Sequence, residues 1–217
     1  MFEFIDVKFK EIIDLPALCF ERKKITTLIG ASGSGKTTIL KMLNKMLSPT
    51  HGRIIYNHTD LRRINSVAHR RQVAMLSQNP AIFEGNIREN LLIGLKLQEK
   101  DLPGDDAVLG VMEQVKLNKP LDSPVYTLSG GEKQRLALGR ILLLNPEVYL
   151  LDEPSAALDE NTEEMIMQMV TGHVRKKNKT LVMVTHSKAI AEQYADTVIE
   201  IVSGRCFRRG ENNERDH

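Results

Sequence analysis

The sequence is poor in the residues that mark several special classes of protein. It contains two cysteines, Cys19 and Cys206, no tryptophan, and 5% aromatic residues. The two cysteines form no CxxC pair and have no group of histidines beside them. The sequence therefore favours neither a structural zinc site nor a disulfide framework, and this cysteine usage fits a reducing cytosol.

Long apolar segments and a strong excess of one charge are also missing. No apolar run approaches the roughly 18 residues needed to span a bilayer. The first residues carry acids where a signal peptide would carry bases and an apolar run. We therefore expect a cytoplasmic protein, and if it drives transport, another chain must form the pore. With 30 Lys+Arg against 28 Asp+Glu, the net charge of +2 gives no general electrostatic case for nucleic acid.

Apolar β-rich segments alternate with helical patterns along most of the 217 residues, which are enough for one domain with a sizeable core. Strands are expected at 25–29, 53–56, 73–76, 148–151, 181–184 and 198–202. Helices are expected at 36–46, 130–144, 161–176, 187–194 and over most of 83–119. This alternation predicts an α/β fold with a mainly parallel sheet, and the helical middle predicts a second lobe.

The amino-terminal segment has a different pattern. Phe2 and Phe4 alternate with polar residues, and Val7 and Phe9 resume the alternation in the other phase. Such a change of phase is expected of an antiparallel edge strand with a β-bulge. The polar tail from residue 208 onwards is predicted to be frayed.

A glycine-rich segment follows the first buried strand and opens a helix. It consists of Gly30, Ala31, Ser32, Gly33, Ser34, Gly35, Lys36, Thr37 and Thr38, which matches the P-loop pattern GxxxxGK[ST]. Backbone N–H groups that converge at a helix start bind phosphates, and glycines let the backbone approach the oxygens. Lys36 would reach the β- and γ-phosphates, and the Thr37 hydroxyl would bind Mg²⁺. The alternative is a glycine-rich turn that binds nothing, but the flanking strand and helix favour a nucleotide site.

Two acids, Asp152 and Glu153, come directly after the apolar strand at 148–151. In P-loop ATPases, an Asp at such a strand end holds Mg²⁺, and a neighbouring group must orient or deprotonate the attacking water. Taken alone, the two acids would more often be the start of a loop. Together with the P-loop they predict nucleotide hydrolysis, with Asp152 at the metal and Glu153 at the water.

A second helix start is also suited to an anion. Ser129 can cap the helix at 130–144, Glu132 stands at the capping-box position, and Gly130 and Gly131 expose backbone amides. Because capping boxes are common, an ordinary capped helix would explain this segment equally well on its own.

Several motifs together resemble the ATP-binding-cassette (ABC) ATPase family. The segment LSGGE at 128–132 is similar to the family signature, and it lies between the P-loop and the strand that ends in Asp152 and Glu153. Gln78 resembles the family's Q-loop glutamine, 155–159 its D-loop, and His186 its switch histidine. The motifs occur in the family's order, and the resemblance covers about 25–202.

This resemblance implies the P-loop NTPase ABC-ATPase fold, with a mainly parallel sheet, an antiparallel N-terminal β part and a helical subdomain. It implies one ABC ATPase domain over 1–217. The RecA-like core would comprise about 1–82 and 134–207, and the helical subdomain about 83–133.

The resemblance also implies roles for individual residues. ATP would be bound by the nine P-loop residues named above. The residues implied in catalysis are Glu153 as general base, His186, Gln78 and Lys36. The residues implied at Mg²⁺ are Thr37, Gln78 and Asp152. The residues implied to contact ATP held by a second copy are Ser129, Gly130, Gly131, Glu132 and Asp159.

The implied partners follow from those roles. A second copy, or a homologous ATPase subunit, would pair head-to-tail around two ATP molecules. A separate transmembrane permease would dock near 81–90, with Ile82 and Phe83 either exposed for docking or packed inside the helical lobe. The protein would then be peripheral on the inner face of the cell membrane, with no nucleic acid expected.

The class of ABC machine is a further prediction. The FxxxIRENL wording at 83–91 resembles export-type cassettes, and the layout resembles the small ATPase of bacterial two-component iron- or metal-related exporters. Two alternatives are a soluble ABC ATPase acting on nucleic acid or ribosomes, and a non-catalytic ATP-binding module. The first usually has coiled coils, zinc inserts or two cassettes, which are missing here. The second disagrees with the presence of Glu153 and His186.

One family feature is not matched. Cassettes usually place an aromatic residue on an early strand to stack on adenine, and that position here holds Lys10 or Glu11. Phe9 or Phe4 could take its place, although both fit the core face of a strand equally well.

Overall fold

The computed structural model describes residues 1–155 and 159–208. Its strands are β1 (Phe2–Phe9), β2 (Ile13–Phe20), β3 (Ile25–Ile29), β4 (His51–Tyr56), β5 (Thr59–Asp60), β6 (Val73–Leu76), β7 (Val148–Asp152), β8 (Thr180–Val184), β9 (Thr197–Val202) and β10 (Arg205–Arg208). Its α-helices are α1 (Lys36–Leu43), α2 (Ser66–Gln72), α3 (Ile87–Lys96), α4 (Asp105–Gln114), α5 (Gly130–Leu144), α6 (Glu160–Lys176) and α7 (Lys188–Tyr194).

The central sheet has six strands in the order β10-β9-β3-β8-β7-β6. All neighbours are parallel except β10, which pairs antiparallel with β9. Every residue of β3, β7 and β8 is buried, as expected of strands covered on both faces. Because parallel strands end at the same edge, the loops after β3, β6, β7 and β8 meet at one edge of the sheet.

The second sheet is antiparallel, with the order β2-β1-β4-β5. Strand β1 lies between β2 and β4, so the expectation that it is an edge strand is wrong. The expected bulge is present: the register against β4 shifts between Ile5 and Lys8, and Asp6 has a φ of 50°. Pro16 of β2 lies opposite Asp6, where the β1–β2 pairing skips a residue and needs no N–H donor.

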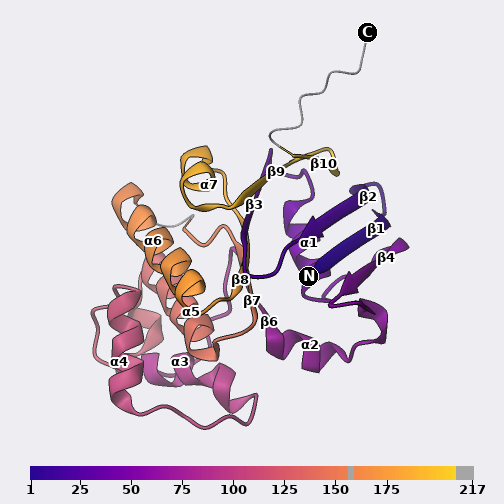
Figure 1. The fold of residues 1–217 in the computed structure, drawn as a ribbon. Helices are drawn as coiled ribbons and strands as arrows, with labels where there is room; N and C mark the ends of the chain where they lie inside the picture. The colour runs from indigo at the N-terminus through magenta and orange to yellow at the C-terminus, as the bar shows by residue number, and fades with distance from the viewer. Residues whose placement is uncertain (156–158, 209–217) are drawn as a thin grey trace.

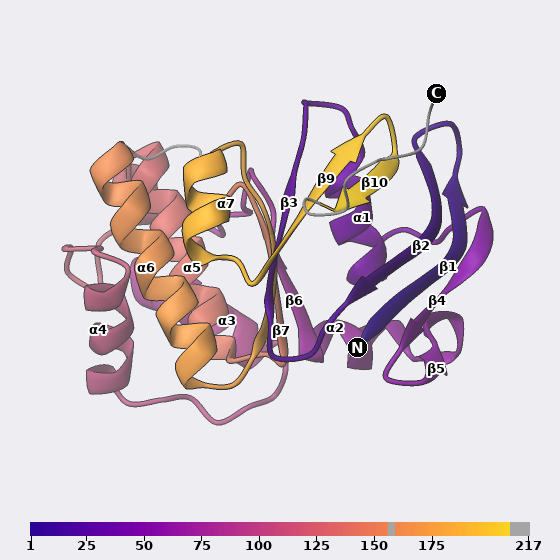
Figure 2. The ribbon, with the colours of Figure 1, turned by 45° about the horizontal axis from the view of Figure 1, so that its top comes forward.

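The layers are visible in Figures 1 and 2, where the central sheet separates α1 and the antiparallel sheet from α5, α6 and α7. Leu40 and Leu43 of α1 pack with Phe2 and Phe4 of β1 and with Val148 of β7 in one buried cluster. A second cluster fills the other face of the sheet and joins it to α5, α6 and the helices α3 and α4. The predicted α/β architecture with an antiparallel amino-terminal part is therefore present.

Four of these strands and helices were not predicted from the sequence: β2, β5, α2 and β10. In addition, α1 ends at Leu43 rather than at residue 46. The chain turns there because Lys45 has a φ of 59°, and the Asn44 side chain donates to Val73 O at 2.6 Å. That contact joins the end of α1 to the start of β6.

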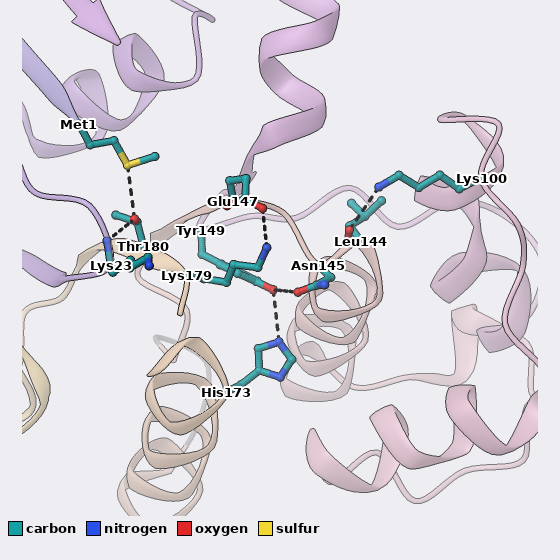
Figure 3. Close-up of polar contacts among 10 residues, drawn as sticks. All are labelled: Met1, Lys23, Lys100, Leu144, Asn145, Glu147, Tyr149, His173, Lys179 and Thr180. Atoms are coloured by element: carbon teal, nitrogen blue, oxygen red, sulfur yellow. Dashed lines mark hydrogen bonds and ion pairs between the residues drawn. The ribbon is translucent and has the colours of Figure 1, made fainter. Parts of the chain in front are cut away.

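The amino ends of β7 and β8 are held together by polar contacts (Figure 3). Lys179 Nζ pairs with Glu147 Oε1 at 2.6 Å, and the Tyr149 hydroxyl lies 3.3 Å from His173 Nε2 of α6. Lys23 N donates to Thr180 Oγ1 at 2.8 Å, which ties the turn before β3 to the same place. Among the described residues, we find no helix with the length and apolarity required to cross a membrane.

Candidate functional site

The loop between β3 and α1 requires glycine for steric reasons. Gly30, Gly33 and Gly35 have φ values of 141°, 77° and 106°, a region that residues with a Cβ rarely adopt. A Cβ on Gly35 would also lie 2.6 Å from Ile13 Cδ1 of β2. The antiparallel sheet therefore packs directly against the loop, and the loop makes a tight turn before α1 begins.

Lys36 begins α1, and its ammonium group folds back over the loop. Nζ donates to Gly30 O at 2.9 Å and to Ala31 O at 2.7 Å, and the side chain is 5% exposed. Burial lowers the pKa of Lys36, while the nearby carboxylates of Glu153 and Asp152 act in the opposite direction. A positive charge is thus held at the centre of the loop.

Thr37 and Asp152 bring two oxygen atoms together behind the loop. Thr37 Oγ1 donates to Asp152 Oδ1 at 3.0 Å, and Asp152 is buried at the end of β7. Burial raises the pKa of Asp152, and the hydrogen bond from Thr37 partly opposes that shift. Hydroxyl and carboxylate oxygens are ligands that Mg²⁺ prefers, so this pair fits a magnesium ion.

Protein ligands alone would not fill the coordination shell of such an ion. The described residues contain no group of three or more His, Cys, Asp or Glu that could hold a metal. A magnesium ion usually keeps several waters and binds through one or two protein groups plus substrate phosphates. The pair formed by Thr37 and Asp152 therefore suits a metal that arrives with a phosphate ligand.

Glu153 lies at the meeting point of three segments. Its Oε2 accepts from Gln78 Nε2 at 2.9 Å, and its Oε1 lies 2.7 Å from His186 Nε2. Its backbone has a φ of 50°, and its N–H donates to Val184 O at 3.1 Å. A non-glycine residue in this region is uncommon and is held by its surroundings. Gln78, Glu153 and His186 come from the loops after β6, β7 and β8, as the parallel sheet requires.

These groups surround a cavity of about 300 Å³. Its lining residues are Ile12, Ser32, Gly33, Gly35, Lys36, Thr37, Thr38, Gln78 and Glu153. The structure thus brings together the P-loop, Gln78 and Glu153. Asp152 accepts a hydrogen bond from the lining residue Thr37, and His186 contacts the lining residue Glu153.

The apolar residue at this cavity is Ile12, which the sequence analysis missed. Ile12 is 41% exposed in the turn between β1 and β2. Phe4 cannot stack on a base, because it is buried with its ring centre 6.0 Å from that of Phe20. Phe9 packs against the core of the antiparallel sheet, with Lys10 Nζ 5.4 Å from its ring centre. Ile12 was missed because strand β2 was not predicted. Without β2, the sequence does not show that Ile12 lies in the turn between two strands.

The second predicted anion site forms a complete capping box at the start of α5. Ser129 Oγ accepts from Glu132 N at 3.2 Å, and Glu132 Oε2 accepts from Ser129 N at 2.8 Å. The backbone hydrogen bond from Ser129 lowers the pKa of Glu132. Ser129 and Gly130 are exposed, and none of the residues at 129–132 lines the cavity. The structure therefore keeps this segment apart from the P-loop of its own chain.

Asp159 caps α6, with Oδ1 accepting from Thr162 N at 3.0 Å. Hydrogen bonds from Thr162 lower the pKa of Asp159. Ser155, at the other end of the predicted D-loop, donates to Glu163 Oε1 at 2.5 Å. Positions 156–158 of that prediction lie outside the described residues.

A second cleft, of about 360 Å³, lies between α1, β6 and α5. Apolar side chains and three cations line it, Lys41, Arg70 and Arg140, without a carboxylate. Phe83 is 39% exposed, and the Arg140 guanidinium lies 4.9 Å from its ring centre. Ile82 is half-buried and packs against the helical core. Of the two alternatives, exposure for docking or packing inside the helical lobe, the first therefore fits Phe83 and the second fits Ile82.

Comparison with known proteins gives a consistent family match. A family model described as ABC transporter matches residues 14–156. The chain is 34% identical over 221 residues to a probable amino-acid import ATP-binding protein, YxeO of Bacillus subtilis, with 95% of this chain and 86% of YxeO covered. It is 32% identical to ABC transporter BEA3 of Gibberella fujikuroi over 214 residues, 94% of this chain but 16% of BEA3. The chain thus spans only a small part of some curated relatives.

Among solved structures, the chain is similar to the dimeric post-hydrolysis state of the ATP-binding cassette MJ0796 bound to ADP and Pi. The TM-score is 0.84 at 25% identity, with 96% of this chain and 97% of that chain covered. The likeness extends over nearly the full length of both chains, including the elements that surround the cavity.

Proposed function

This chain belongs to the ABC transporter family, and on that premise we propose that it binds and hydrolyses ATP to power a separate membrane permease. The observation that carries the proposal is the convergence of Lys36, Thr37, Gln78 and Glu153 on one cavity at the carboxyl edge of the sheet. A helix start suited to phosphate, an oxygen pair suited to a metal ion and a carboxylate suited to activate a water lie side by side there.

The residues of the cavity would share the work on the phosphates. The loop amides and the Lys36 ammonium would bind the β- and γ-phosphates, replacing the carbonyl oxygens that Lys36 now contacts. Thr37 and Asp152 would hold Mg²⁺ together with the phosphate oxygens, with Gln78 reaching the same ion. When bound, Mg²⁺ neutralises charge that develops on the transferring phosphoryl group.

Glu153 would act on the attacking water. Its carboxylate can accept the proton as the water oxygen approaches the γ-phosphorus, which is general-base catalysis. Gln78 and His186 fix the two carboxylate oxygens through contacts of 2.9 Å and 2.7 Å. We assign these two residues to orientation of Glu153 and of the γ-phosphate, because both contact the carboxylate that would face the attacking water.

The exposed start of α5 supports a head-to-tail dimer. Ser129 and Gly130 present hydrogen-bonding groups to the surface, away from the cavity of their own chain. In a pair of copies, each signature segment (129–132) with Asp159 would complete the ATP site of the other. The dimeric solved cassette that resembles this chain supports such an arrangement.

A permease would dock at the cleft of about 360 Å³ that Lys41, Arg70 and Arg140 line. Exposed Phe83 beside it extends the apolar surface. We propose that the direction of transport is export, on the resemblance of 83–91 to export-type cassettes, and that the chain is peripheral at the inner face of the membrane. We also propose the division into a RecA-like core (about 1–82 and 134–207) and a helical subdomain (about 83–133).

The first experiment is the molar mass of the Glu153→Gln variant by size exclusion with light scattering, with and without Mg-ATP. Loss of the general base should trap bound ATP and double the molar mass only when Mg-ATP is present. A chain that binds ATP but remains a monomer would contradict self-pairing. A chain that binds no ATP would contradict the proposed activity itself.

The docking proposal has its own test. Phe83→Glu places a carboxylate on the exposed surface without filling the ATP cavity, so ATP hydrolysis by the isolated chain should remain within about twofold of wild type, as expected for a surface change. In the native host, the variant should leave the membrane fraction for the soluble fraction. Unchanged membrane association would contradict docking through this surface.

A further inference from the structure

Arg140, in the middle of α5, makes three hydrogen bonds to other segments of the chain, outside the ATP cavity. Its Nε donates to Asn90 O at 2.8 Å, one terminal nitrogen to Ala81 O at 2.9 Å, and the other to Asn90 Oδ1 at 3.0 Å. The guanidinium also lies 4.9 Å from the ring centre of Phe83. One side chain thus joins α5 to α3 and to the loop before α3.

Asn90 completes this contact from within α3. It is 0% exposed, its Nδ2 donates to Phe83 O at 2.8 Å, and its Oδ1 accepts from Phe83 N at 2.9 Å. The backbone of the loop is therefore clamped on both sides of Phe83. Its amide groups are satisfied by one side chain, which Arg140 in turn holds in place.

The loop concerned connects β6 to α3 and contains Gln78. Its first part is held at the ATP cavity, where Gln78 Nε2 donates to Glu153 Oε2 at 2.9 Å. Its second part is held by Arg140 and Asn90 through Ala81 and Phe83. The start of α5, ten residues before Arg140, is the signature segment. The side chain of Arg140 therefore links the helix that begins at the signature segment to the loop that contains Gln78.

The charge of Arg140 has no carboxylate to balance it among the described residues. No acidic side chain forms an ion pair with Arg140, and the cleft that it lines contains two further cations, Lys41 and Arg70. Burial lowers the pKa of Arg140 to about 10, which leaves it charged at neutral pH. A hydrophobic residue would pack there without this cost, so the planar fork of donors is the property that the site uses.

We propose that Arg140 is a positioning residue for Gln78, which it holds at Glu153 by fixing Ala81 and Phe83 to α5. The inference rests on the proposed ATPase function and adds a residue to it. Its physical basis is geometric: three N–H donors in one rigid plane determine where the loop can lie relative to α5. A shift of the loop by about 1 Å would be enough to reduce turnover strongly.

The test is a double-mutant cycle with Arg140→Lys and Gln78→Ala, measured as ATP turnover by the full chain in Mg-ATP. Lysine keeps the charge and loses the fork, so kcat should fall about tenfold or more, as for a misplaced catalytic group, while the KM for ATP stays within about twofold. In the Gln78→Ala background, Arg140→Lys should change kcat by less than about twofold, because its effect runs through Gln78. Arg175→Lys is the matched control, since Arg175 also donates to a carbonyl, Tyr194 O at 3.0 Å, far from the loop.

Several outcomes would overturn the proposal. Equal losses of kcat in both backgrounds would mean that Arg140 acts without Gln78. A lowered melting temperature with unchanged kcat would assign Arg140 to stability alone, and a Gln78→Ala variant with wild-type kcat would leave nothing to position. If Arg140→Lys does not fold, Asn90→Asp keeps the acceptor for Arg140 and for Phe83 N but removes the donor to Phe83 O, and it should reduce kcat about threefold, again only when Gln78 is present. A wild-type chain that hydrolyses no ATP would instead contradict the proposed function.

Discussion

The starts of α1 and α5 are both helix N-termini with glycines that expose backbone amides, yet they differ in their surroundings. At α1, the loop surrounds the buried Lys36 ammonium and faces a cavity with Glu153 on its other side. At α5, Ser129 and Gly130 are exposed and the chain supplies only the capping box. The first site is assembled within one chain, and the second presents its donors outward.

The glycines of the two sites show the same contrast. Gly35 has a φ of 106°, and a Cβ there would collide with Ile13, so the fold itself requires glycine. A Cβ on Gly130 would meet nothing within 4 Å, and its φ is not in the left-handed region. Glycine at a helix start without a steric reason costs conformational entropy. We infer that the small residue at 130 serves a ligand from outside the chain, in agreement with the proposed dimer.

The largest expected effect is that of Gly130→Asp on hydrolysis. A carboxylate at the start of α5 favours the helix dipole, so the fold should be unchanged, but it would face the phosphates bound by the partner copy. ATP turnover should fall at least about 100-fold, while ATP binding by the monomer stays within about twofold. Calorimetric titration measures ATP binding by the monomer, and phosphate release measures ATP turnover. A parallel loss of binding would show that the two sites are not separate.

Lys36→Ala should give the opposite pattern. Removing the ammonium at the centre of the loop should weaken ATP binding about 10- to 100-fold in the monomer, the value of a charge-assisted hydrogen bond. Gly130→Asp is the matched comparison, because one variant changes the start of α1 and the other changes the start of α5. Equal ATP affinity of Lys36→Ala and wild type in titration calorimetry would contradict the assignment of Lys36.

A smaller difference is expected in stability between two Gly→Ala substitutions. Gly35→Ala combines a left-handed backbone with the contact to Ile13 Cδ1 and should cost about 2 kcal/mol of unfolding free energy. Gly130→Ala should be neutral or stabilise by about 0.5 kcal/mol, because alanine loses less entropy in a helix. Urea unfolding of both variants measures the difference. Equal destabilisation would mean that Gly130 is also required by the fold.

The smallest effect is that of Ser129→Ala. It removes the acceptor for Glu132 N and should cost about 1 kcal/mol of unfolding free energy, the usual value of an N-cap. Thermal unfolding measures the loss, and Thr127→Ala on the exposed turn before it provides a control. A loss much above that value would imply contacts of Ser129 within its own chain beyond the capping box.

Much of the candidate site was predictable because its segments carry local signals. The P-loop, Asp152 with Glu153 and the cap at Ser129 each depend on residues within a few positions of one another. Strand β2 was missed because Pro16 interrupts its pattern, and Pro16 is tolerated only because it lies opposite the irregular pairing at Asp6. The missed strand in turn hid Ile12 and led to the wrong placement of β1 at an edge.

The sequence by itself determined the α/β alternation, the phosphate-binding loop and the capped start of α5, since turn chemistry and hydrophobic period act over short distances. The tertiary structure decided which segments meet. Gln78 and His186 reach Glu153 only because parallel strands end at a common edge. Arg140 reaches Asn90 across 50 positions of sequence because α3 packs on α5, a contact that depends on shape and has no local pattern.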